Sequence, residues 1–121
     1  MAIILIIDDE LSMRRLLTRA LSGAGHTVHQ APDGGVGLQL FRDIRPALVI
    51  TDIVMPDVEG IQTIREVRHD DNHVPILAIS GSDPIYLHFA KELGATAALR
   101  KPFAVAKLLT TVEALLCAES R

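Results

Sequence analysis

The sequence has few aromatic residues and a single cysteine, and both shortages limit what the chain can be. One tyrosine and three phenylalanines are its only aromatic side chains, and tryptophan is absent. We therefore expect a core built from aliphatic side chains. The single cysteine, Cys117, excludes an internal disulfide bond and suits a reducing compartment. The corresponding prediction is a cytoplasmic protein.

Positive net charge and long apolar segments are missing as well. The formal net charge of −3 at pH 7 argues against direct nucleic-acid binding, because that function requires a broad basic surface. The apolar segment near the start, residues 2–7, is followed at once by Asp8, Asp9 and Glu10. It is too short for a membrane span and has the wrong flanking charges for a signal peptide. We therefore expect a soluble protein without membrane association.

What the sequence does contain is a fivefold alternation of predicted strands and helices. Runs of aliphatic and β-branched residues predict strands, and apolar residues spaced by three and four predict the helices between them. The predicted strands cover Ile3–Ile7, His26–Ala31, residues 48–50, Ile76–Ile79 and Ala95–Arg100. Helix stripes follow at Met13, Leu16, Leu17, Ala20, Leu21 and Ala24; at Leu40, Phe41 and Ile44; at Ile61, Ile64 and Val67; at Tyr86, Phe89, Ala90 and Leu93; and at Val105, Leu108, Leu109, Val112, Leu115 and Leu116.

Five strand–helix units predict one α/β domain over residues 1–121, a doubly wound (βα)5 fold with a parallel sheet. Its first, third and fourth strands are continuous apolar runs that suit the centre, whereas the second and fifth are thinner and suit the edges. This composition fits the flavodoxin-like strand order 2-1-3-4-5. In such sheets ligands bind outside the carboxyl ends of the strands, where the order reverses.

Chemically active side chains stand at those carboxyl ends. The first strand leads to Asp8 and Asp9, the third to Asp52, the fourth to Ser80 and the fifth to Lys101. Three carboxylates at the reversal point repel one another, so the pKa of at least one of them is expected to rise. A hard divalent cation such as Mg²⁺ relieves this repulsion. An acidic cation site with a lysine and a hydroxyl beside it suits phosphoryl transfer.

The motifs that carry these residues resemble those of the receiver domain of the two-component response-regulator family. The resemblance covers essentially the whole chain, and the expected strand order rests partly on it. The motifs are the acidic pair Asp8-Asp9, Asp52-x-x-Met55-Pro56 with Gly60, Ser80-Gly81, and Lys101-Pro102-Phe103.

The resemblance implies a role for each site residue. Asp52 is the phosphoacceptor, taking a phosphoryl group from a phosphohistidine of a sensor histidine kinase or phosphotransfer protein. Asp9, Asp52 and the backbone carbonyl of Val54 bind Mg²⁺ directly, and Asp8 acts largely through water. The phosphoryl oxygens contact the remaining three residues: Lys101, the hydroxyl of Ser80 and the amide of Gly81. The family also implies a cis Lys101–Pro102 peptide bond and a surface on the fourth and fifth helices, near Tyr86 and His88, for an output domain or a homodimer.

One position departs from the family pattern, and two others bear on how fast the phosphoryl group is lost. Receivers usually carry Tyr or Phe three residues before the lysine, where this chain has Ala98. We therefore expect output to travel through the loop after Ser80 and the fourth helix. In the family, the positions of Val54 and Ser82 line the approach of hydrolytic water, and an apolar Val54 predicts slow loss of the phosphoryl group.

Three classes of function remain open from the sequence. The first is a phosphorylatable switch that is an enzyme only toward its own phosphoryl group. The second is a receiver-like interaction module without working phosphorylation, which Ala98 keeps open. The third is a Mg²⁺-dependent phosphatase with an aspartyl-phosphate intermediate, which Asp8-Asp9-Glu10 fits poorly because such enzymes usually carry Asp-x-Asp after the first strand.

Overall fold

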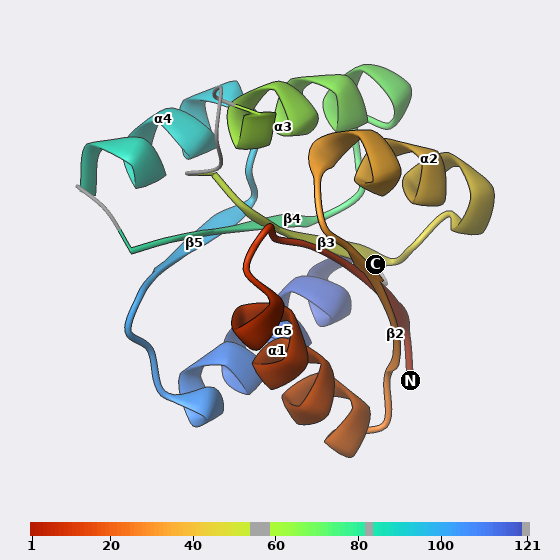
Figure 1. The fold of residues 1–121 in the computed structure, drawn as a ribbon, viewed down its shortest axis with the longest axis vertical. Coiled ribbons are helices and arrows are strands. Elements are labelled where there is room, and N and C mark those ends of the chain that lie inside the picture. The colour runs from red at the N-terminus through yellow and green to blue at the C-terminus, as the bar shows by residue number, and fades with distance from the viewer. Residues whose placement is uncertain (54–58, 82–83, 120–121) are drawn as a thin grey trace.

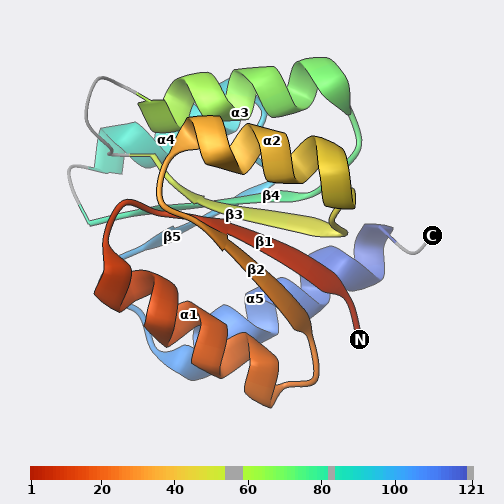
Figure 2. The ribbon, with the colours of Figure 1, turned by 45° about the vertical axis from the view of Figure 1, so that its right-hand side comes forward.

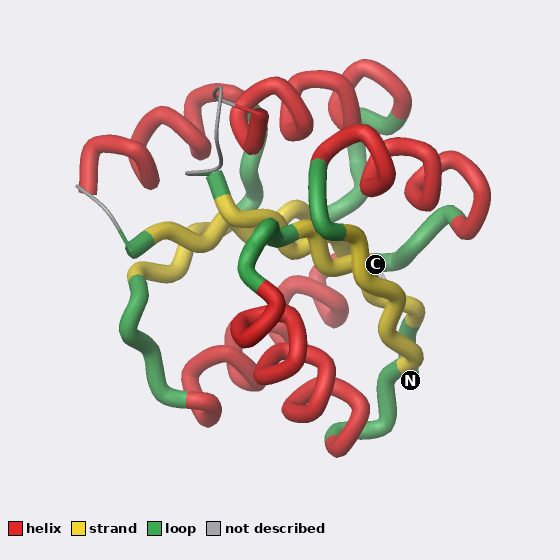
Figure 3. The backbone as a smooth tube through the Cα atoms, viewed as in Figure 1, coloured by secondary structure: helices red, strands yellow, loops and turns green. Residues whose placement is uncertain are grey.

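The computed structural model describes residues 1–53, 59–81 and 84–119, and these form a five-stranded parallel sheet covered by helices on both faces (Figure 1). Strands and helices alternate along the chain, as Figure 3 shows by colour. The strands are β1 (Ile3–Ile7), β2 (Thr27–Ala31), β3 (Leu48–Asp52), β4 (Ile76–Ser80) and β5 (Ala97–Arg100). The helices are α1 (Leu11–Gly23), α2 (Gly34–Ile44), α3 (Glu59–Asp70), α4 (Pro84–Leu93) and α5 (Val105–Glu119).

The strand order is β2-β1-β3-β4-β5, and every neighbouring pair is parallel. This confirms the predicted flavodoxin-like order, with its reversal between β1 and β3. The composition argument also holds for the positions of the strands. Strands β3 and β4 are buried along their whole length and β1 along all but its first residue, whereas β2 and β5 are partly exposed edges.

Alternate side chains of each central strand enter different cores. Leu5 and Ile7 of β1 pack in the core under α2, α3 and α4, while Ile4 and Ile6 pack in the core above α1 and α5. Figure 2 shows these two helical layers from the side. The sequence period of two in a strand thus separates two cores. Gly37 is needed for close packing of α2, because a Cβ there would lie 2.7 Å from Cγ1 of Ile7.

Local signals explain where several helices begin and end. The carboxylate of Asp33 accepts a hydrogen bond from the amide of Val36 at 2.9 Å and caps α2, as predicted. After α1, Gly25 takes a φ of 96°, a conformation that glycine adopts without steric cost. The predicted cap of the fourth helix, Asp83, lies outside the described residues.

Four strand boundaries and the exposure of three large helix side chains differ from the predictions. Strand β2 begins at Thr27 rather than His26, and β5 at Ala97 rather than Ala95. Strand β3 ends at Asp52 rather than at residue 50, and β4 ends at Ser80 rather than at Ile79. Leu16, Phe89 and Val105 were expected on buried stripes, but their exposed fractions are 43%, 44% and 41%. Each lies at the margin of an apolar stripe that is wider than the face its helix buries, so helical spacing alone overcounts the core.

Candidate functional site

The candidate site lies at the carboxyl ends of the parallel strands. Asp8 follows β1 directly, Asp52 and Ser80 are the last residues of β3 and β4, and Lys101 follows β5. The start of the chain and the second half of α5 lie at the opposite edge of the sheet, where they line a separate hollow of about 590 Å³ (Figure 2). The fold therefore brings together the residues that the sequence analysis selected.

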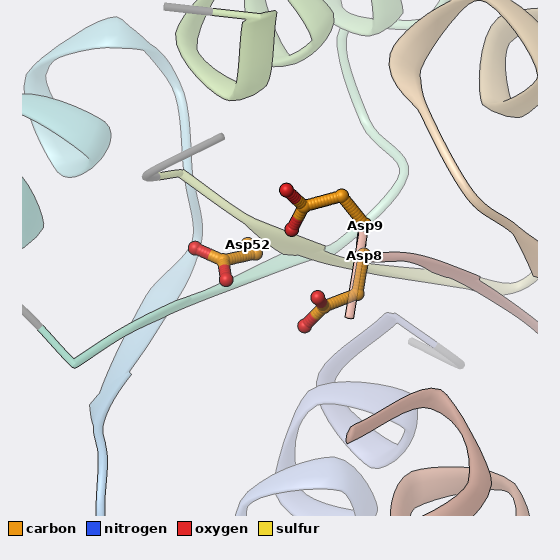
Figure 4. Close-up of side chains that lie close together, drawn as sticks. All are labelled: Asp8, Asp9 and Asp52. Carbon is orange, nitrogen blue, oxygen red and sulfur yellow. The ribbon is translucent and has the colours of Figure 1, made fainter. Parts of the chain in front are cut away.

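Three carboxylates form the centre of the site. Asp8, Asp9 and Asp52 each offer an oxygen atom, and the three atoms lie within 4.8 Å of one another. Figure 4 shows the three side chains at the junction of β1 and β3 (Figure 4). Asp8 and Asp52 are buried, whereas Asp9 is exposed. Oxygen ligands at this spacing suit a hard divalent cation such as Mg²⁺.

Burial places an electrostatic cost on the carboxylate of Asp8. Burial raises its pKa to about 6; the hydrogen bond from the Glu10 amide opposes this rise, and the charge of Asp52 adds to it. Oδ1 accepts that amide hydrogen bond at 2.8 Å. Oδ2 is buried and has no hydrogen-bond partner within the described part of the chain. The predicted rise in pKa is thus correct in direction, but burial rather than repulsion between carboxylates is its main cause.

Lys101 supplies the positive charge of the site. Its Nζ lies 3.0 Å from Oδ2 of Asp52 and 3.8 Å from Oδ2 of Asp8. Burial acts to lower the pKa of Lys101, but the hydrogen bond and charge of Asp52 outweigh it and raise the pKa. The ammonium group is therefore charged at neutral pH. The Lys101–Pro102 peptide bond is cis, as predicted.

The end of β4 lies against this lysine. The amide of Lys101 donates to the carbonyl of Ser80 at 2.8 Å, and Ser80 is fully buried. A Cβ on Gly81 would lie 3.4 Å from Cβ and Cδ of Lys101, so the lysine stem runs alongside Gly81. Val54 and Ser82, also assigned to the site from the sequence, lie outside the described residues.

Three contacts within the site were not foreseen. Nη1 of Arg14 donates to the carbonyl of Asp8 at 2.6 Å, and the hydroxyl of Thr51 donates to the carbonyl of Asp52 at 3.1 Å. At Gly60, a Cβ would collide with the carbonyl oxygen of Asp52 and lie 2.6 Å from Cα of Ile53. Gly60 belongs to the motif that follows Asp52, and this close approach gives a steric reason for glycine at that position. The arginine, six residues after Asp8, had no motif to mark it.

The position where the family has an aromatic residue is filled differently. Ala98 lies in β5, half-buried, and packs against the core under α2, α3 and α4. On the other face of the sheet, a hollow of about 400 Å³ adjoins the site and is lined by Met13, Leu16, Gly81, Lys101, Pro102 and Phe103. Among the helices that the structure describes, we find none long and apolar enough to cross a bilayer.

Comparison with known proteins gives a consistent result. The family model of the response regulator receiver domain matches residues 4–113. Response regulator MprA of Mycobacterium sp. (strain KMS) is 37% identical over 114 residues, which cover 93% of this chain and 50% of the relative. MprA of Mycobacterium bovis (strain BCG / Pasteur 1173P2) is 35% identical over 114 residues, with the same coverage of both chains. The chain thus spans about half the length of the curated relatives it matches.

Solved structures extend the likeness to the fold. NtrX from Brucella abortus in complex with ADP superposes with a TM-score of 0.93 at 30% identity, covering 98% of this chain and 28% of that one. The chemotaxis response regulator CheY4 of Vibrio cholerae gives a TM-score of 0.87 at 32% identity, covering 95% of this chain and 98% of that one. The same fold therefore occurs both within a much longer protein and almost alone.

Proposed function

Because the chain belongs to the response-regulator receiver family of two-component signalling, we propose that it is a phosphorylation-dependent switch. In this proposal Asp52 accepts a phosphoryl group from a phosphohistidine of a sensor histidine kinase or phosphotransfer protein, in a Mg²⁺-dependent reaction. The observation that carries the proposal is the cluster itself. Three carboxylate oxygens lie within 4.8 Å of one another, and the ammonium group of Lys101 lies 3.0 Å from Asp52.

The residues fit a divalent cation on electrostatic grounds. A buried carboxylate oxygen of Asp8 lacks a hydrogen-bond partner among the described residues, and a cation nearby would compensate it. We assign Asp9, Asp52 and the backbone carbonyl of Val54 as direct ligands and Asp8 as a ligand acting largely through water. Bound there, Mg²⁺ would supply neutralisation of charge on the phosphoryl oxygens.

Phosphoryl transfer then needs one nucleophile and one mobile cation from the chain. A carboxylate oxygen of Asp52 attacks phosphorus and forms the O–P bond while the N–P bond of the phosphohistidine breaks. The imidazole leaves with the bonding electron pair and takes a proton from solvent. Lys101 exchanges its contact with Asp52 for one with a phosphoryl oxygen, and Ser80 and the amide of Gly81 donate to the others.

The test is incubation of the protein with Mg²⁺ and a small acyl phosphate, followed by intact mass measurement. We expect a gain of one phosphoryl group, lost in an Asp52→Asn variant. No gain would instead support an interaction module without working phosphorylation. Repeated turnover of added phosphate monoesters would support a phosphatase. Retention of the mass gain without turnover supports the view that the chain is no enzyme beyond its own phosphorylation and dephosphorylation.

Output from the switch forms a separate part of the proposal. With Ala98 in β5, we propose that phosphorylation acts through residues 81–93, including α4. Ile85 and Phe89 of α4 and Val105 of α5 are exposed apolar side chains, which suits an output domain or a second copy at this surface. The side chain of Tyr86 lies outside what the structure describes. Unchanged amide chemical shifts at 81–93 on phosphorylation would contradict this route.

The proposal has three further parts. They concern the residues that the domain covers, the compartment in which it works and the rate at which the phosphoryl group is lost. We propose one domain over residues 1–121, working in the cytoplasm without direct contact with nucleic acid or membrane. Because an apolar Val54 cannot orient water, loss of the phosphoryl group should be slow. A Val54→Asn variant that loses the group no faster would contradict this expectation.

A further inference from the structure

Asp8 lies in the turn between β1 and α1, and hydrogen bonds from the end of β2 and from α1 hold its main chain. Its amide donates to the carbonyl of Ala31 at 3.1 Å, at the end of β2. Its carbonyl accepts from Nη1 of Arg14 at 2.6 Å. The carboxylate adds a local hydrogen bond from the amide of Glu10. Among the described residues, every polar group of Asp8 except Oδ2 therefore has a hydrogen-bond partner, and Oδ2 lies 3.8 Å from Nζ of Lys101. The peptide that joins Asp8 to Asp9 is thus held in one orientation.

Arg14 is well suited to hold this peptide. It lies in α1, six residues beyond Asp8, and its side chain is half-buried and reaches back toward the turn. A guanidinium group that donates to a carbonyl at 2.6 Å makes a charge-assisted hydrogen bond, which is stronger than a bond between neutral groups. The helix that carries Arg14 packs on β1 through Leu17 and Leu21, so the arginine is anchored on a rigid element.

The guanidinium acts on the main chain rather than on the acidic group. The charged side chains that influence the carboxyl of Asp8 are those of Asp52, Lys101 and Asp9. The contact of Arg14 is with the carbonyl oxygen, which belongs to the same peptide unit as the amide of Asp9. A shift of that unit would move both acidic side chains of the pair.

From these contacts we infer that Arg14 is a positioning residue for the cation site: it fixes the peptide that presents Asp8 and Asp9 to a divalent cation. The inference rests on the proposed function, since it assumes that the acidic cluster binds Mg²⁺. It adds a residue that no sequence motif of the site contains. Positioning groups of this kind typically change metal affinity about 10- to 100-fold when removed, and an effect through the main chain belongs at the lower end.

The sign of the effect separates positioning from simple charge. Removing a cation near an anionic site, with no change of geometry, tightens the binding of Mg²⁺ or leaves it unaltered. Removing a group that holds the ligands in place weakens binding. Arg15 provides the matched control, because it is the next residue, carries the same charge and is exposed.

The experiment is a calorimetric titration of Mg²⁺ into the full chain and into Arg14→Ala, Arg14→Gln, Arg14→Lys and Arg15→Ala variants. Urea unfolding of each variant without metal reports its stability separately. We expect Arg14→Ala and Arg14→Gln to bind Mg²⁺ about tenfold more weakly, since neither reaches the Asp8 carbonyl with a charged donor. Arg14→Lys keeps a long charged donor and should stay within about threefold of the parent chain, and Arg15→Ala should bind no more weakly than the parent.

Each other outcome overturns the inference. Unchanged or tighter binding in the folded Arg14→Ala or Arg14→Gln variant would show that the arginine acts only as a nearby charge or as a structural tie. If Arg15→Ala weakened Mg²⁺ binding as much as Arg14→Ala, the change in net charge would explain the loss of affinity. If Arg14→Lys weakened it equally, a charged donor at position 14 would not be what maintains the affinity. A parent chain that binds no Mg²⁺ would instead contradict the proposed function itself, so the two failures are distinguishable.

Discussion

Two charged groups at opposite edges of the sheet differ in the hydrogen bonds that the surrounding residues offer them. At the amino-terminal edge, the guanidinium of Arg68 in α3 donates to the carbonyls of Gly94 at 2.8 Å and Val74 at 2.6 Å, and to the hydroxyl of Thr96 at 3.2 Å. At the carboxyl edge, Oδ2 of Asp8 is buried and lacks a hydrogen-bond partner within the described residues.

The difference separates a charged group whose hydrogen bonds hold the fold together from a carboxylate oxygen that has no hydrogen bond from the described residues. Arg68 links the end of α3 to the segments that precede β4 and β5, so its guanidinium group stabilises the fold through these hydrogen bonds. The carboxyl of Asp8 is kept near a like charge in a buried place, at a cost to stability. Unsatisfied buried polar atoms are rare in native proteins, and where they gather beside a perturbed pKa they indicate a functional site.

Loss of the satisfied charge should have the largest effect. An Arg68→Met variant keeps much of the side-chain bulk but leaves several carbonyls without their donor, and we expect it to lower the free energy of unfolding by about 3 kcal/mol. Urea unfolding measures the change, with Arg65→Met, an exposed arginine on the same helix, as the control. Binding of Mg²⁺ by the folded fraction should be unaltered. A loss below about 1 kcal/mol would contradict the structural role.

Loss of the unsatisfied charge should act in the opposite direction. With the pKa of Asp8 raised from 3.8 to about 6, ionisation of the folded protein at pH 7 costs about 3 kcal/mol from the shift alone, and about 2 kcal/mol once screening by solvent is discounted. An Asp8→Asn variant should therefore be more stable than the parent without metal, by about that amount, and should lose its response to Mg²⁺. For the stability without metal, Asp9→Asn is the control, since Asp9 is exposed. A metal-free Asp8→Asn protein that melts below the parent would refute this account.

The pH dependence of stability gives a smaller, independent measure of the same cost. The pKa of Asp8 is higher in the folded than in the unfolded state, so between about pH 4 and pH 6 the folded state binds more protons than the unfolded state. Stability should therefore decrease by about 1 kcal/mol between pH 5 and pH 7 in the metal-free protein, and this change should disappear in Asp8→Asn. Thermal melts at both pH values test it, and a slope that persists in the variant would assign it to other groups.

The smallest effect is expected at an ion pair on the surface. Nε of Arg42 lies 2.6 Å from Oδ2 of Asp70 and links α2 to α3, but the arginine is largely exposed to water. Exposed pairs contribute little because water and salt screen their attraction. An Arg42→Ala variant should melt within experimental error of the parent. A loss of stability as large as that of Arg68→Met would contradict this expectation. It would mean that the short distance between the two charged groups, rather than burial and full hydrogen bonding, decides how much a pair contributes to stability.

The sequence predicts the framework of this protein well because its strands differ clearly in composition. Continuous aliphatic runs mark the three central strands, and the parallel arrangement of all five strands brings Asp8, Asp52 and Lys101 to one edge. A strand boundary that depends on tertiary contacts was missed. His26 was assigned to the second strand, but it precedes β2 and is buried because Nδ1 accepts from the amide of Ala2 and Nε2 donates to Glu113.

Finer features of the site depend on turn geometry that no local pattern encodes. The sequence indicates that Asp8 and Asp9 are adjacent, but not that one is buried and the other exposed. It marks Arg14 only as one of two arginines at the start of a helix. Only the folded structure shows that Arg14 reaches back to the Asp8 carbonyl while Arg15 is exposed.

The complete burial of β3 and β4 has a consequence for hydrogen exchange. Their amides, with those of β1, should exchange with solvent only when the entire molecule unfolds, and should be the last to take up deuterium. Asp8, Asp52 and Ser80 are thus attached to the strands that we expect to open last. In the proposed switch, a signal would therefore travel through segments that can rearrange against these strands, while the strands hold the proposed reacting groups in place.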